Sequence, residues 1–388
     1  MLCAQTKNGD MICLPPYSRS EIEEMRKRAH FYCPTCNDKL IIKIGTEITP
    51  HFSHPSVSTC SGGGEGEIHE RGKWLLYNWL KDQYEHVHLE YYIEETNRRP
   101  DIFLRMHHKK FAVEFQYSSV PTRDIRKRNE LYQNIEIIPI WFLDIKYLKQ
   151  RGKNTFIVDA FAKQFLCQPS NHSSPFILYF CTVSKQIISL QHISFLSLNK
   201  VLAKKVVYTL ENSFWSEIFQ CRPYSRKHYL KRWKAEKKKF RLQYRNGVGK
   251  QKQWLLWLYE HQLSIDYLPS MIHLPVKGQM FMKVQTWNWQ SRLWYYLQFE
   301  RGENNPFSLE DCINYLAPYI YPPNYYPLLQ HTKSPVASYI EWLCILGYVH
   351  QQTEQTFILK QSIPELSHIE EAIKQDQILM DHITRLYV

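Results

Sequence analysis

The chain has 388 residues, a net charge of +12, and 44% hydrophobic and 14% aromatic residues. It is too long for one ordinary domain and apolar enough for folded cores, which excludes a disordered chain. The sequence contains no apolar run of about 18 residues, so no transmembrane helix is predicted. The N-terminus lacks the apolar centre of a signal peptide. We therefore expect a cytoplasmic protein whose ten cysteines are mostly reduced.

Residues 1–62 predict a small domain of short strands and turns with one helix. Cys3 and Cys13 flank an Asn-Gly turn signal that favours a hairpin. Ser20 and Glu23 fit a capping box at the start of the helix. The glycine-rich stretch 61–66 is the first expected domain boundary.

Within this domain, five residues are candidate zinc ligands: Cys33, Cys36, His51, His54 and Cys60. The Cys-x-x-Cys turn brings two sulfurs to the same side, and two predicted strands would return the histidines to them. Four of the five would hold a structural zinc ion that folds a domain too small for a large core. The alternative is a redox pair or two unrelated thiols. Redox pairs lie at a helix N-terminus, whereas a strand is predicted after Cys36.

Residues 63–150 predict a compact α/β domain. A helical pattern begins at Glu67 and is followed by three strand-like runs, 89–95, 101–106 and 111–116. A second helix over 122–134 and a buried strand over 135–144 complete the domain. Residues 151–388 predict a mainly helical domain, with a small mixed segment at 151–205.

Asp101 and Glu114 form a candidate carboxylate pair on neighbouring strands. Alternation of side chains puts Glu114 and Gln116 on one face. If Met106 pairs with Phe111, Asp101 joins that face opposite Gln116, whereas a slip of one residue would turn it away. Two close carboxylates are costly without a cation, so the pattern predicts a Mg²⁺ or Mn²⁺ site. The alternative is a hairpin whose charges face water.

Polar residues of the two flanking helices could complete this site. Glu67, His69, Glu70 and Lys73 lie in the first helix, ahead of the strands, and His69 and Lys73 share a face. Arg128 and Tyr132 are four residues apart in the second helix and could reach a phosphate. For each of them the alternative is a solvated helix surface.

The positive charge is concentrated in one stretch. Residues 222–252 hold 13 of the 49 Lys and Arg residues and one of the 37 Asp and Glu residues, so the remainder is balanced. This predicts a nucleic-acid partner, with an anionic membrane surface as the alternative. Aromatic residues at helical spacing, such as Trp233 and Phe240, are expected to pack inward. The candidate DNA-binding residues are Arg226, Lys231, Arg232, Lys237, Lys238, Lys239 and Arg241.

The ordered motifs of residues 25–145 resemble the competence protein CoiA family. In chain order they are FYCPTCNDKLIIKIG, HFSH, Cys60, GEIHERGKWLLYNWL, RRPDIFL, FAVEFQYSS, RKRNELY and IPIWFLD. The order of helix, strands with Asp and Glu-x-Gln, and helix is similar to the core of the PD-(D/E)xK nuclease superfamily. Gln116 stands at the position of the usual lysine of that superfamily.

This resemblance implies a fold class and a role. We expect an α/β protein with a zinc-finger-like N-terminal domain, a PD-(D/E)xK nuclease-like domain and a mainly helical C-terminal domain. The implied role is in natural transformation, where incoming single-stranded DNA is processed and recombined, with recombination proteins as further partners. The implied catalytic trio is Asp101, Glu114 and Gln116, helped by Glu67 or Glu70, His69, Arg128 and Tyr132.

Three hypotheses about activity follow. The leading one is a deoxyribonuclease that depends on Mg²⁺ or Mn²⁺. The second, favoured by Gln116, is a non-catalytic DNA-binding recombination factor that retains the nuclease fold. The third is a zinc-stabilised scaffold that binds only protein, whose DNA affinity would be weak and insensitive to salt.

Overall fold

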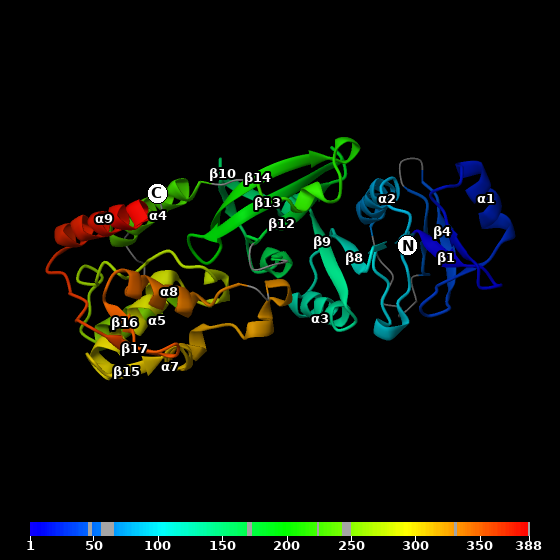
Figure 1. Cartoon of the computed structure of the whole chain (residues 1–388). Coiled ribbons are helices and arrows are strands. Elements are labelled where there is room, and N and C mark those ends of the chain that lie inside the picture. The colour runs from blue at the N-terminus through cyan, green and yellow to red at the C-terminus, as the bar shows by residue number, and fades with distance from the viewer. Residues whose placement is uncertain are drawn as a thin grey trace.

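The computed structural model arranges the chain as three regions in a row (Figure 1). They are a small N-terminal sheet with one helix, a large central sheet, and a C-terminal region rich in helices. The predicted fold class is confirmed. The structure describes residues 1–45, 49–55, 66–168, 173–222, 225–242, 250–329 and 332–386, without the side chains of Arg226, Lys250 and Pro323.

The N-terminal region is built on a five-stranded sheet in the order β2-β1-β3-β4-β5. Its elements are β1 (Cys3–Gln5), β2 (Met11–Cys13), α1 (Arg19–Arg28), β3 (Phe31–Tyr32), β4 (Lys39–Lys43) and β5 (His51–Ser53). The predicted hairpin is confirmed, since β1 and β2 are antiparallel and Cys3 lies opposite Cys13. These two cysteines form a disulfide, which the sequence did not predict.

The capping box of α1 lies two residues before the predicted one. The Ser18 hydroxyl accepts from the backbone of Glu21, and the Glu21 carboxylate accepts from the backbone of Ser18 at 2.7 Å. The prediction of Ser20 and Glu23 was therefore wrong. Both pairs satisfy the same spacing rule, but the helix begins at Arg19, so Ser20 already lies in the first turn.

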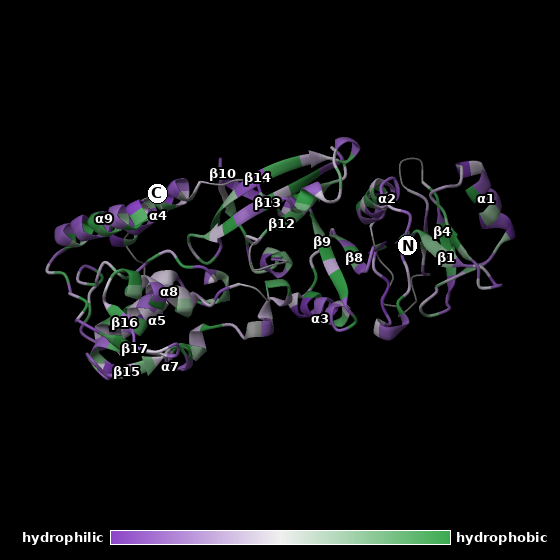
Figure 2. Cartoon of the chain, in the orientation of Figure 1, coloured by the Kyte–Doolittle hydropathy of each residue, from purple (hydrophilic) through white to green (hydrophobic). Residues whose placement is uncertain are grey.

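The central sheet has nine strands in the order β10-β11-β14-β13-β12-β9-β8-β7-β6. Residues of α2 pack on one face with Phe115, and those of α3 pack on the other with Trp141. In Figure 2, β9 is mostly hydrophobic and α3 beside it is mostly hydrophilic, as expected for a buried strand covered by a surface helix. The elements are α2 (Glu67–Lys81), β6 (Val87–Leu89), β7 (Ile102–Met106), β8 (Lys109–Gln116), α3 (Thr122–Gln133), β9 (Ile137–Asp144), β10 (Lys149–Gly152), β11 (Thr155–Ile157), β12 (Ile177–Cys181), β13 (Gln186–Phe195) and β14 (Lys200–Thr209).

Two features of this region differ from the sequence-based expectation. The strand expected over 89–95 is wrong: β6 ends at Leu89, and Glu90 turns the chain with a φ of 50°. A 3₁₀ turn, η1 (Glu94–Thr96), follows. The expected boundary at residue 150 falls inside β10, and the strands up to Thr209 are hydrogen-bonded into the same sheet.

The C-terminal region packs helices around buried tryptophans such as Trp233, Trp254 and Trp289. A three-stranded sheet in the order β15-β17-β16 lies among them. No helix of the described ranges is both long and apolar enough to cross a membrane. The elements are α4 (Arg226–Leu242), α5 (Lys250–Glu260), α6 (Thr286–Tyr295), the π-helix η7 (Tyr296–Arg301), β15 (Pro306–Ser308), α7 (Leu309–Tyr315), α8 (Pro335–Ile345), β16 (Val349–Gln351), β17 (Thr356–Leu359) and α9 (Ile369–Leu386).

Candidate functional site

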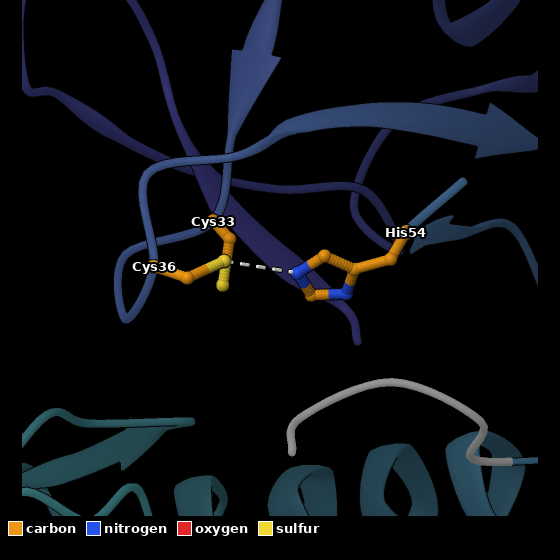
Figure 3. Close-up of side chains that lie close together, drawn as sticks. All are labelled: Cys33, Cys36 and His54. Atoms are coloured by element: carbon orange, nitrogen blue, oxygen red, sulfur yellow. Dashed lines mark hydrogen bonds between the residues drawn. The ribbon is translucent and has the colours of Figure 1, made fainter. Parts of the chain in front are cut away.

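A cysteine–histidine cluster lies at the turn between β3 and β4 of the N-terminal sheet (Figure 3). The sulfurs of Cys33 and Cys36 and a ring nitrogen of His54 lie within 4.8 Å of one another. Cys36 Sγ is 3.3 Å from His54 Nε2. The turn that brings the two sulfurs together is closed by Asn37, whose backbone nitrogen donates to the Cys33 carbonyl at 2.8 Å. The antiparallel pairing of β4 and β5 returns His54 to this turn.

This cluster fits a structural zinc ion. Thiolate sulfur and imidazole nitrogen are the donors that zinc prefers in small folding sites, and three such donors already face one another. The structure thus brings together three of the five predicted ligands. His51 is not among them; its Nδ1 lies 3.0 Å from the Thr49 carbonyl oxygen. Cys60 lies outside the described residues.

The carboxylate pair lies at the central sheet: Asp101 directly precedes β7, and Glu114 lies near the end of β8. Ile102 pairs with Val113, so Asp101 comes opposite Glu114. The predicted register was wrong by two residues, because the chain reverses over His107 and His108 and not over a four-residue loop. An even shift preserves the face. Asp101 is 7% exposed and Glu114 is 3% exposed, so both carboxylates are buried.

Helix α2 presents His69, Glu70 and Lys73 to this pair. His69 Nε2 lies 3.3 Å from Asp101 Oδ2. The buried Lys73 ammonium lies 3.0 Å from Glu70 Oε2, 2.6 Å from Glu90 Oε1 and 4.0 Å from Asp101 Oδ1. Lys73 is therefore the cation at the centre of three carboxylates, and Glu90 is a member of the site that the sequence did not identify.

Helix α3 presents Arg128 and Tyr132 to Glu114. The Tyr132 hydroxyl donates to Glu114 Oε1 at 2.7 Å, and Arg128 Nη1 lies 3.3 Å from Oε2. Burial raises the pKa of the Glu114 carboxyl to about 7; Arg128 opposes this shift and Asp101 adds to it. Arg128 and Tyr132 were predicted to reach a phosphate, and the structure places both on this carboxylate.

Two predicted residues are not brought into contact with the pair. Glu67 is exposed at the first turn of α2, and no described contact joins it to Asp101 or Glu114. The Gln116 side chain lies on the expected strand, but its amide donates to the Ser118 carbonyl.

The site is already rich in positive charge. Lys73 compensates Glu70 and Glu90, and Arg128 compensates Glu114. Among the described residues, only the cysteine–histidine cluster brings together three ligand atoms from His, Cys, Asp or Glu side chains. Asp101 and Glu114 nevertheless have the oxygen donors that Mg²⁺ or Mn²⁺ prefers. A divalent cation beside them would favour the ionised form of Glu114 against the effect of burial.

The predicted basic residues of α4 divide into two groups. Lys231, Arg232, Lys238 and Lys239 are exposed. Lys237 and Arg241 are buried and both pair with Asp376 of α9, at 3.3 and 2.9 Å, so their prediction as DNA-binding residues was wrong. These ion pairs join α4 to α9, which pack against each other. The Arg226 side chain is not among those described.

The aromatic residues of α4 pack as predicted. Leu230, Trp233 and Phe240 are buried in the C-terminal core, on the side of the helix away from the exposed lysines. Tyr244, which continues the same spacing, lies outside the described residues. The helix is thus amphipathic, with an apolar inner face and a basic outer face.

Comparison with known proteins identifies three matching domain families. Residues 14–62 match "Competence protein CoiA, N-terminal domain", residues 65–223 match its nuclease-like domain, and residues 224–373 match its C-terminal domain. A curated relative, "Competence protein CoiA" of Bacillus subtilis (strain 168), is 25% identical over 365 residues, which cover 90% of this chain and 95% of the relative. No solved structure matches the chain.

Proposed function

Because the chain belongs to the competence protein CoiA family, we propose that it processes DNA during natural transformation as a metal-dependent nuclease. The observation that carries this proposal is the buried pair of Asp101 and Glu114, directly opposite on neighbouring strands of the nuclease-like domain. Two carboxylates held this close in a buried site are uncommon away from functional sites, which supports the proposal.

In this proposal Asp101 and Glu114 hold Mg²⁺ or Mn²⁺. The bound ion would supply a Lewis acid for the scissile phosphate. Arg128 and Tyr132 orient the Glu114 carboxylate, since both contact its oxygens. His69 Nε2 lies 3.3 Å from Asp101 Oδ2 and is placed to hold a proton beside the carboxylate pair.

DNA cleavage tests this proposal. Full-length protein should cut linear or single-stranded DNA with Mg²⁺ or Mn²⁺, and Asp101→Asn and Glu114→Gln should each lower the rate by at least about 100-fold. Glu85→Gln is the matched control, because Glu85 is an exposed carboxylate of the same domain. Circular dichroism must show that the variants fold. Full cleavage by the double variant would show that the catalytic assignment is wrong.

A second function is favoured by Gln116 and Lys73. Gln116 donates to Ser118, and Lys73 places an ammonium among the carboxylates. Both features suit a DNA-binding recombination factor that keeps the nuclease fold without cutting. Calorimetry distinguishes the two functions. A nuclease should show a heat of Mg²⁺ or Mn²⁺ binding that is lost in the Asp101→Asn variant, whereas a non-catalytic factor should bind DNA without such a metal-binding heat.

The proposed partner in either case is DNA, followed by recombination proteins, and the proposed compartment is the cytoplasm. The exposed lysines and arginine of α4 support the DNA contact, because a basic outer helix face can follow a phosphate backbone irrespective of base sequence.

A further inference from the structure

The sheet face of Asp101 and Glu114 continues beyond these carboxylates. The pairing of β6 with β7 places His88 opposite Phe103, and the pairing of β7 with β8 places Arg105 opposite Lys110. Side chains two residues apart in a strand share a face and lie about 7 Å apart. Along β7 that face therefore presents Asp101, then Phe103, then Arg105: an acid, an aromatic ring and a base.

Three aromatic side chains gather at the middle of this face, and we call them the aromatic platform: His88, Tyr91 and Phe103. The rings of Tyr91 and Phe103 are stacked, with centroids 4.9 Å apart and planes 26° apart. The His88 ring lies 5.6 Å from Tyr91 and 6.5 Å from Phe103. Tyr91 is 46% exposed, so much of its ring is open to a ligand.

Positive charge flanks the platform on the side away from the carboxylates. Arg105 and Lys110 are exposed, and neither forms an ion pair with an acidic side chain in the described part of the chain. A ligand that crosses this face would meet two cations, then stacked rings, then the carboxylate pair. That sequence of chemistry suits a polyanion that carries flat aromatic groups.

We propose that the aromatic platform binds single-stranded DNA, by stacking of unpaired bases on Tyr91 while Arg105 and Lys110 contact the phosphates. Bases in a duplex stack on each other, so an exposed protein ring selects strands whose bases are free. Phe103 of the platform lies two residues from Asp101 in the chain and on the same face of the sheet. Single-stranded DNA bound there would therefore lead toward the carboxylate pair. This inference rests on the proposed DNA function, and it assigns the strand form and the residues that select it.

Fluorescence anisotropy with labelled oligo(dT) and with a duplex of equal length tests the inference on the full-length protein. Tyr91→Ala should weaken oligo(dT) binding by about 5- to 100-fold, the range for loss of one stacking ring, and should leave duplex binding within about twofold. Tyr91→Phe retains the ring and should restore the wild-type affinity. Tyr259→Ala is the matched control, because Tyr259 of α5 is 81% exposed and far from this sheet in the chain.

Photo-crosslinking gives a second measurement. An oligonucleotide with 5-iodouracil should crosslink to the peptide that contains Tyr91, as mapped by mass spectrometry. If Tyr91→Ala binds oligo(dT) as tightly as wild type and the crosslink lies elsewhere, the platform is not the binding site, although the DNA function stands. If the wild-type protein binds neither DNA form, both the DNA function and this inference are overturned.

Discussion

At the scale of single residues, Lys163 is a buried cation far from the carboxylate pair in the chain. It is 6% exposed, and burial lowers its pKa to about 8, with Asp159 opposing the shift. The folded protein releases this proton before the unfolded chain does, so stability should rise between about pH 8 and pH 10.5 and be lost again as the pH falls through 8.

Lys163→Met tests this linkage. The variant removes the cost of a buried charge, so at pH 7 it should be more stable than wild type by roughly 2–3 kcal/mol. The advantage should shrink as the pH approaches 10, because wild-type Lys163 is then neutral. Urea unfolding of both proteins across this range measures the difference. Lys153→Met, at an exposed position, should change neither the stability nor its pH profile; an advantage for Lys163→Met that stays constant with pH would contradict the argument.

The cysteine–histidine cluster makes a second prediction at this scale. Purified protein should contain about one zinc ion per chain, and Cys36→Ser or His54→Ala should lower that content. His51→Ala is the control, since His51 is a histidine of the same domain that contributes no ligand atom to the cluster. Removal of the metal by a chelator should make residues 1–45 sensitive to protease, because the ion contributes to folding.

Elemental analysis and limited proteolysis provide both measurements. Zinc content that is unchanged in Cys36→Ser and His54→Ala would contradict the assignment. The same measurement on Cys60→Ser tests the one predicted ligand that lies outside the described residues.

At the scale of elements, the approach of α2 to β8 depends on Gly72. A Cβ atom at this position would lie 2.2 Å from Cε1 of Phe115. Gly72→Ala should therefore destabilise the fold by about 1–3 kcal/mol, although alanine is the better helix former by about 1 kcal/mol. It should also shift His69 and Lys73 relative to Asp101. Thermal unfolding measures the loss of stability.

Gly66 supplies the matched control for this substitution. A Cβ atom there meets nothing within 4 Å, so Gly66→Ala causes no clash and should cost at most about 1 kcal/mol, for the less favourable N-cap residue of α2. Equal stability of the Gly72→Ala and Gly66→Ala variants would mean that the helix can move away from Phe115 without cost.

The outer face of α4 makes a further prediction. Lys231 and Lys238 are exposed and seven residues apart, so they lie on one face. The double variant Lys231→Glu/Lys238→Glu should bind single-stranded DNA more weakly and lower the slope of log K against log salt by about 1.4, which is two phosphate contacts. The control double variant, Lys360→Glu/Lys374→Glu, reverses two other exposed lysines. An equal change of slope in both would indicate that net charge, and not α4, controls binding.

The local elements near the site were largely predictable from sequence, and the contacts between distant segments were not. Hydrophobic periodicity predicted α2, β8, α3 and β9, because each pattern is contained within one short segment. The register of β7 and β8 was off by two residues, since the HHKK turn contains no glycine or asparagine to fix its length. The face of the carboxylates survived that error because the side-chain period is two.

Burial of charged residues was the part that sequence could not predict. Lys237 and Arg241 have the same local sequence pattern as their exposed neighbours. They are buried because both form ion pairs with Asp376, which lies 135 residues from Arg241 in the chain. Glu90 was missed for the same reason. Its partners come from the first strand and from α2, and no spacing within one segment reveals such a meeting.

At the scale of the whole molecule, Glu90 joins the N-terminal region to the central sheet. Its carboxylate accepts from the backbone nitrogens of Leu2 and Cys3 at 2.9 and 3.0 Å. The same carboxylate pairs with Lys73 and lies 3.8 Å from Arg99. Glu90 therefore contacts both the start of the chain and Lys73, as does Glu70, whose carboxylate lies 2.6 Å from the Met1 ammonium and 3.0 Å from Lys73.

Arg99 extends this connection to the cysteine–histidine cluster. Its Nη2 donates to Thr35 Oγ1 at 3.0 Å and lies 3.9 Å from Cys33 Sγ. Thr35 lies between the two cysteines of the turn, so Arg99 contacts both the cluster and Glu90. A change of charge at Glu90 should therefore affect both the cysteine–histidine cluster and the candidate site of the central sheet.

Glu90→Gln should loosen the N-terminal region from the central sheet. The amide keeps the shape of the side chain but removes the charge that compensates Lys73 and Arg99, and loss of one partner from a buried ion pair costs about 3–5 kcal/mol. Hydrogen exchange in residues 1–45 should become faster, and these residues should unfold at lower urea than the central sheet. Glu94→Gln, four residues away and exposed, should leave both unchanged. If exchange in residues 1–45 is the same in Glu90→Gln as in wild type, the two regions are held together by other contacts, such as the ion pair of the Met1 ammonium with Glu70, and not by this carboxylate.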